Sequence, residues 1–223
     1  MGQRESVAAV DQFHCRIAIF FRLRMDTNII RQVLHPAGWE IEPRPQPPGL
    51  IEASPETVVV PSTETLARKG SWSSDYVHDR FMMRIYSPLS DVATLAEEVK
   101  EAFRTRNYEF PEMVRYYEFG ILHQPIDLRR ASGRLRSEFK TSLVESIGSA
   151  LSEELGVYSV SLSNSETPLN DQWMLIELTP EVISPQSRLF IRMTKRAEDF
   201  ESLMEFMRLL AERLKRVISI IEG

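Results

Sequence analysis

Arginine alternates with apolar residues in three stretches of the chain, and this pattern could form a binding surface for anions. Residues 14–24, 80–86 and 188–194 each place mainly Ile, Leu, Met or Phe on one side of a predicted strand and arginine on the other. A guanidinium group binds phosphate or carboxylate through a planar fork of donors, and an aromatic ring stacks on other rings. The candidate ligand-binding residues are Arg22, Arg24, Arg84, Arg192, Phe20, Tyr86 and Phe190, with Arg80 and Arg188 on the same side.

The same pattern has an ordinary explanation, because an exposed sheet face commonly carries paired charges. Acidic residues on neighbouring predicted strands could neutralise the arginines, namely Glu40, Glu42, Glu52, Glu118 and Glu177. The sequence therefore leaves open whether the arginines form a binding site or a salt-bridged surface.

A different chemistry would need a carboxylate beside a histidine, since the pair can act as a general base. Residues 75–79 hold Asp75, His78 and Asp79, and His123 is the other candidate catalytic residue. Against an enzyme, the chain lacks the Gly-x-Ser-x-Gly, His-Glu-x-x-His and Gly-x-Gly-x-x-Gly motifs. Its four histidines and single cysteine, Cys15, show no metal-ligand spacing. We therefore expect no metal site and no cofactor, and favour a protein that is not an enzyme.

Helices must cover the apolar side of the arginine-bearing strands. In the first half, residues 13–110, the strand at 14–24 precedes a short helix capped by Asp26 or Thr27. The strand at 80–86 precedes a helix capped by Ser90 or Asp91 and reaching about Arg106, with Val92, Leu95, Ala96, Val99 and Phe103 at helical spacing. Prolines forbid a helix between 39 and 72, so short strands are predicted at 39–42, 50–53 and 57–60.

The second half, residues 111–223, repeats this order of elements. A strand at 113–123 precedes a helix capped by Ser132 and ending at Gly156, whose apolar stripe is Leu135, Phe139, Leu143, Ile147 and Leu151. Strands follow at 157–163, 172–179 and 188–194, and a long helix spans 197–221. Residues 1–12 are predicted to be a flexible N-terminus.

These elements predict an α+β fold made by tandem duplication of a β-α-β(3-4)-α unit and packed as one globular unit. Helices with a single apolar stripe would pack on one face of a curved antiparallel sheet. The order of elements resembles that of helix-grip and TATA-binding-protein-like folds, and residues 39–50 resemble a turn of the latter. The second half has no matching Pro-Gly-Leu turn, and we assign no family.

Composition narrows the class of protein. The 223 residues are 43% hydrophobic with a formal net charge of −5, which is typical of a globular chain and not of a generally basic nucleic-acid binder. Neither a signal peptide nor a run of ~20 apolar residues is present, so we expect a cytoplasmic protein without membrane association.

Three functions follow from these patterns. The leading hypothesis is a non-catalytic binding protein whose arginine- and aromatic-rich face meets an anionic or protein partner, with nucleic acid left open. The alternatives are a small-molecule-binding, helix-grip-like domain with an apolar pocket and an enzyme of unfamiliar type around residues 75–79. The terminal helix is apolar over more than half its circumference, which predicts either packing between the halves or a homodimer through 197–221.

Overall fold

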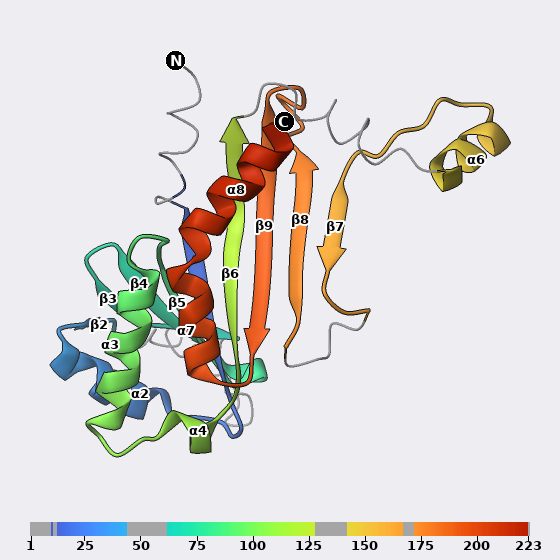
Figure 1. The fold of residues 1–223 in the computed structure, drawn as a ribbon. Coiled ribbons are helices and arrows are strands. Elements are labelled where there is room, and N and C mark those ends of the chain that lie inside the picture. Colours follow the sequence, from blue (N-terminus) through green and yellow to red (C-terminus); the bar gives the residue numbers. More distant parts are fainter. Residues whose placement is uncertain (1–9, 11–12, 44–61, 128–141, 167–171, 223) are drawn as a thin grey trace, which may run out of the picture.

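The computed structural model describes residues 10, 13–43, 62–127, 142–166 and 172–222, which form an α+β fold around one antiparallel sheet (Figure 1). Nine strands follow the order β2-β3-β4-β5-β1-β6-β9-β8-β7. β1 (His14–Phe21) and β6 (Val114–Asp127) therefore pair in the middle of the sheet. The predicted fold class and the antiparallel sheet are confirmed.

The first half supplies five strands and two longer helices. After β1 come α2 (Thr27–Leu34), the 3-10 helix η2 (His35–Ala37), β2 (Glu40–Ile41), β3 (Thr63–Lys69), β4 (Trp72–Val77), the 3-10 helix η3 (His78–Arg80), β5 (Met82–Pro88) and α3 (Val92–Arg104). The predicted strands at 50–53 and 57–60 lie outside the described residues.

The second half supplies four strands. Its elements are α4 (Phe110–Met113), β6, α6 (Ser142–Leu151), β7 (Val160–Ser163), β8 (Met174–Pro180), β9 (Arg188–Ala197), α7 (Phe200–Arg208) and α8 (Leu210–Glu222). The helix predicted from Ser132 to Gly156 is described only from Ser142, because residues 128–141 lie outside the described part. It ends at Leu151 and not at Gly156, because the chain turns at Ser152.

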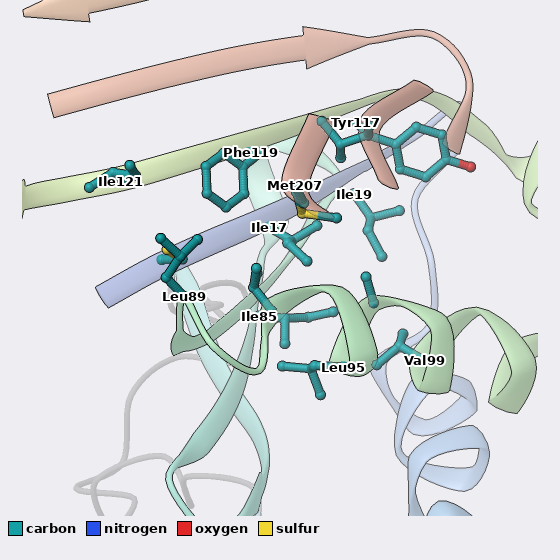
Figure 2. Close-up of a cluster of buried hydrophobic side chains, with 14 of the residues drawn as sticks. Ile17, Ile19, Ile85, Leu89, Leu95, Val99, Tyr117, Phe119, Ile121 and Met207 are labelled. Atoms are coloured by element: carbon teal, nitrogen blue, oxygen red, sulfur yellow. The ribbon is translucent and has the colours of Figure 1, made fainter. Parts of the chain in front are cut away.

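One face of the sheet is buried under helices α2, α3, α7 and α8 (Figure 1). Figure 2 shows Ile17 and Ile19 of β1 meeting Leu95 and Val99 of α3, with Met207 of α7 beside them. All five predicted stripe residues of α3 are buried, which confirms that helix. Aromatic rings fill the layer under α3 and α7, with Phe110 and Tyr117 both in edge contact with Phe200.

The β3–β4 hairpin is missing from the sequence prediction. Lys69 pairs with Trp72 across a two-residue turn in which Gly70 adopts φ 58, a conformation that glycine takes without strain. The alternation of apolar and polar residues in these strands is incomplete, because the polar residues Glu64 and Ser74 occupy the helix-covered face.

Two further helix predictions need correction. The single helix predicted at 197–221 is two helices, α7 and α8, separated at Leu209. The stripe predicted to be buried in α6 is exposed at every described position, with Leu143 at 67%, Ile147 at 44% and Leu151 at 62% exposure. α6 lies beyond β7, away from the sheet, and not on the helix-covered face (Figure 1).

Candidate functional site: an arginine-lined groove

The sheet face turned away from the helices, here called the outer face, carries an open groove of about 690 Å³. It is lined from both halves of the chain by Arg16, Phe20, Phe21, Arg22, Arg80, Phe81, Met82, Arg115, Tyr116, Glu118, Trp173, Leu175, Arg192, Thr194 and Arg196. Six of these are arginines, and among the described lining residues the one acidic side chain is Glu118. We call this the outer-face groove.

Strand pairing explains why these residues meet. β1 and β6 place Phe20 opposite Tyr116, and β6 and β9 place Glu118 opposite Arg196. On the far side of β9, Trp173 lies next to Arg196, whose backbone N–H donates to the Trp173 carbonyl at 2.7 Å. Residues distant in sequence thus become neighbours on one surface.

Glu118 holds two of the arginines in fixed positions. One carboxylate oxygen accepts from Arg16 at 2.5 Å and the other accepts from Arg196 at 2.9 Å. The Glu118 side chain is only 9% exposed, so this charge is shielded from water while both guanidinium groups stay partly exposed. A carboxylate with two cationic partners leaves a net positive charge at the groove floor.

Aromatic rings form the rest of the floor. Phe20 and Tyr116 are stacked with ring centroids 4.3 Å apart. The Arg196 guanidinium lies 5.5 Å from the Tyr116 ring and 5.1 Å from the Trp173 ring, close enough for cation–π contact with both. The groove therefore offers cationic donors beside flat aromatic surfaces.

Three arginines at the groove have no carboxylate partner among the residues that the structure describes. Arg22, Arg80 and Arg115 are exposed and form no ion pair with any residue that the structure describes. Arg80 closes η3, and the next residue, Phe81, adopts a left-handed φ of 51 and exposes its ring. Phe81 was predicted to point into the core, and this prediction is wrong because the chain turns there before β5 begins.

The predicted ligand-binding residues divide into two groups. Phe20, Arg22 and Arg192 line the groove, although Arg192 also contacts Glu177 at 3.3 Å. Arg24 is exposed and does not line it. The strand predicted at 14–24 ends at Phe21, so both Arg22 and Arg24 lie beyond β1. Phe190 belongs to the outer face of β9 but is not among the lining residues.

Arg84 and Tyr86 belong to a separate cluster on β4 and β5. Arg84 binds both oxygens of Asp75, at 2.7 and 2.6 Å, and the Tyr86 hydroxyl donates to Asp75 at 3.5 Å. Burial, followed by the charge of Asp75, raises the pKa of Tyr86. Asp75, one of the catalytic candidates, therefore acts here as the partner of an arginine, and Arg188 is likewise paired, with Asp127 and Glu181.

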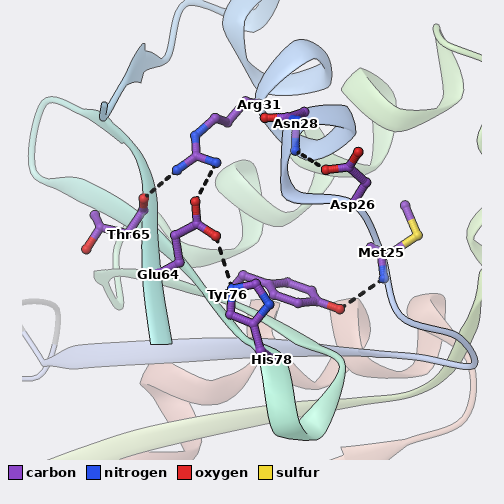
Figure 3. A network of polar contacts seen from close by, with 8 residues as sticks. All are labelled: Met25, Asp26, Asn28, Arg31, Glu64, Thr65, Tyr76 and His78. Atoms are coloured by element: carbon purple, nitrogen blue, oxygen red, sulfur yellow. Dashed lines mark hydrogen bonds and ion pairs between the residues drawn. The ribbon is translucent and has the colours of Figure 1, made fainter. Parts of the chain in front are cut away.

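His78 lies in a buried polar cluster under α2 (Figure 3). The Glu64 carboxylate contacts Arg31 at 2.7 Å and His78 Nε2 at 3.0 Å, and both Glu64 and Arg31 are over 90% buried. Burial raises the pKa of Glu64, but the hydrogen bond and charge of Arg31, with hydrogen bonds from His78 and Thr27, bring it below its ordinary value. This cluster ties α2 to β3 and η3.

The remaining catalytic candidates do not join His78. Asp79 is exposed in η3 and forms no ion pair with a described residue, and the side chain of His123 lies outside the described part.

Within the described ranges, no group of three or more His, Cys, Asp or Glu side chains could hold a metal ion. Nor do those ranges contain a helix with the length and apolar character that crossing a membrane requires.

Sequence reasoning missed Arg16, Arg115, Tyr116, Trp173 and Arg196 as site residues. Their signal was weak because each strand contributes only one or two of them, and only the pairing of β1, β6, β9 and β8 brings them together.

The chain has no significant match to a protein-family model, to a curated protein or to a solved structure.

Proposed function

We propose that this chain is a binding protein that takes a ligand with several anionic groups and planar rings into the outer-face groove. A phosphate-bearing chain such as single-stranded nucleic acid combines these features, because its phosphates suit guanidinium groups and its bases stack on aromatic side chains.

The observation that carries the proposal is the charge imbalance of the groove. Six arginines and one carboxylate line the groove, and Glu177 contacts Arg192 from outside it. Arg22, Arg80 and Arg115 have no ion-pair partner among the described residues. An ordinary salt-bridged face would neutralise its arginines, as Asp75 does for Arg84 elsewhere on the same sheet face. The groove departs from that pattern.

Trp173 provides a built-in probe for the test. A short single-stranded DNA oligonucleotide is titrated into the protein while tryptophan fluorescence is followed. Trp39 and Trp72, the other two tryptophans, pack near each other with ring centroids 6.4 Å apart and do not line the groove. We expect the emission to change on binding and the affinity to fall steeply with salt, because phosphate contacts release counterions.

Two controls make the result specific. The substitution Trp173→Phe should abolish the fluorescence change, and inorganic tripolyphosphate should compete if phosphate contacts dominate. No binding at low salt, or a fluorescence change that persists without Trp173, would contradict binding in this groove.

We also infer that the two halves arose by duplication of one unit. Supporting this, β1 and β6 occupy equivalent central places and pair antiparallel, and each is followed by a helix and then by strands that return from the sheet edge to its centre. α3 follows the first set and α7 the second. On this interpretation the groove, which takes residues from both halves, needs the duplicated arrangement.

A further inference from the structure

The helix that follows the central strand is buried in the first half and exposed in the second. α2 buries Ile30, Val33 and Leu34 against the sheet and α3. α6, which follows β6, instead exposes Leu143 and Leu151, at 67% and 62%. In α6 the only buried residue is Gly148. Two helices in equivalent places along the chain thus have opposite environments.

The sheet in the second half has an uncovered area that matches this exposed helix. On the helix-covered face, Leu162 of β7 pairs with Ile176 of β8, and Leu162 is 49% exposed. Met174 and Ile176 are half-buried, and Tyr158, whose hydroxyl donates to the Pro180 carbonyl at 3.3 Å, is 52% exposed. α7 and α8 lie over β6 and β9, and no described helix lies over β7 (Figure 1). We call Tyr158, Leu162, Met174 and Ile176 the open corner.

Local packing gives α6 a defined way to present its stripe. The chain reverses after the helix at Ser152, which has φ 57, and the Glu153 N–H donates to the Gly148 carbonyl at 3.0 Å. A Cβ added at Gly148 would lie 2.7 Å from the Glu153 carbonyl oxygen, so only glycine allows this close return. Helix and turn together form one small unit that projects past the sheet edge.

We propose that the chain forms a two-fold symmetric dimer in which α6 of each copy packs on the open corner of the other. In the first half, α2 covers the corresponding part of the sheet. This equivalence identifies α6 as the helix that packs on the open corner. Its position beyond β7, pointing away from its own sheet, favours the corner of a second copy. Reciprocal exchange of one element is a low-cost route to a dimer. This surface differs from the predicted one at 197–221, where α7 and α8 use most of their apolar residues in the core.

Mixing two variants with one added cysteine each tests exchange directly. Ile147→Cys lies on the α6 stripe and Leu162→Cys lies in the open corner, and a tag on one chain separates the two by mass. Cys15 is fully buried and burial raises its pKa to about 12, so it stays unreactive. A short bismaleimide should link the tagged and untagged chains into a heterodimer. If no heterodimer forms, or if a chain carrying both added cysteines links only within itself, the proposal is wrong.

Light scattering on gel filtration provides the second test. Leu143→Glu with Leu151→Glu should convert a dimer into a folded monomer, because both leucines are exposed within one chain. The matched control is Leu23→Glu, the same substitution at a 77% exposed leucine outside α6 and the open corner. It should leave the dimer intact. A monomeric wild type throughout the micromolar range, or a dimer that survives the double substitution, would overturn the proposal.

Discussion

Single charges decide how the outer-face groove is built. Glu118 accepts from Arg16 and Arg196 at once, so one shielded carboxylate orients two guanidinium groups. Arg16 also lies across from Gly120 on β6, where the absence of a side chain leaves space beside the guanidinium. The groove thus depends on the buried carboxylate of Glu118 as much as on the exposed arginines.

Replacing Glu118 with Gln should destabilise the fold. Both arginines would remain partly buried beside a neutral amide, and breaking such a pair costs about 3 kcal/mol. Urea denaturation of the variant measures this loss. Glu177→Gln is the control, because Glu177 is 29% exposed and its contact with Arg192 is longer, so it should cost less than about 1 kcal/mol. Equal losses for the two variants would refute the structural role of Glu118.

Glu64 gives the fold a dependence on acid. Its pKa in the folded chain lies below the ordinary carboxyl value because the opposing contacts of Arg31, His78 and Thr27 outweigh the effect of burial. A lowered folded pKa stabilises the fold above the unfolded pKa, and that contribution is lost as pH falls through the folded value. The free energy of unfolding should therefore decline on acidification below about pH 4.5.

The substitution Glu64→Gln should flatten this acid dependence while lowering stability at neutral pH. Chemical denaturation between about pH 6 and pH 3 measures both effects. Glu101→Gln serves as the comparison, since the exposed Glu101 also has a lowered pKa through its hydrogen bond with Arg104 but is screened by solvent. If the free energy of unfolding of Glu64→Gln falls with acid as it does in the wild type, the buried cluster does not control this decline.

Among the elements, α7 connects the two halves over the sheet. Its residues pack on β6 and β9, and ion pairs join it to α3 through Lys100 with Glu201 and Arg208 with Glu97. The helix begins at an N-cap, where the Asp199 carboxylate accepts from the Ser202 N–H at 2.7 Å. The Asp199 side chain therefore fixes where α7 begins.

Asp199→Ala should lower stability by about 1 kcal/mol, the usual cost of losing an N-cap acceptor. Asp199→Asn keeps an acceptor oxygen and should recover most of the loss. Thermal unfolding followed by circular dichroism compares the two variants. Equal stability of Asp199→Ala and the wild type would mean that the cap does not determine the start of α7.

Elements with a single clear periodicity could be predicted from the sequence. β1 alternates between buried Ile17 and Ile19 and half-exposed Arg16 and Phe20, and α3 repeats apolar residues at helical spacing. The ends were less predictable. Arg22 leaves the strand because the register shifts after Phe20 and the Arg22 N–H then donates to the Met113 carbonyl, a contact with a distant segment.

For the whole molecule, the central β1–β6 pair joins the two halves into one continuous sheet and places the groove across their junction. Phe20 comes from the first half, while Tyr116 and Trp173 come from the second. The sequence predicted an arginine-rich face but could not say which arginines would be neutralised. That outcome depends on cross-strand neighbours such as Asp75 beside Arg84, and on their absence beside Arg115 among the described residues.

The central claim is that unpaired arginines make the groove an anion-binding site. The most direct measurement compares the oligonucleotide affinity of the triple variant Arg22→Ala, Arg80→Ala and Arg115→Ala with that of Arg106→Ala. Arg106 is also exposed, has no ion pair among the described residues and lies outside the groove. The triple variant should lose about tenfold in affinity per arginine, as expected if each charged contact contributes about 1.5 kcal/mol, whereas Arg106→Ala should bind like the wild type. Equal affinities of the triple variant and Arg106→Ala would contradict the account.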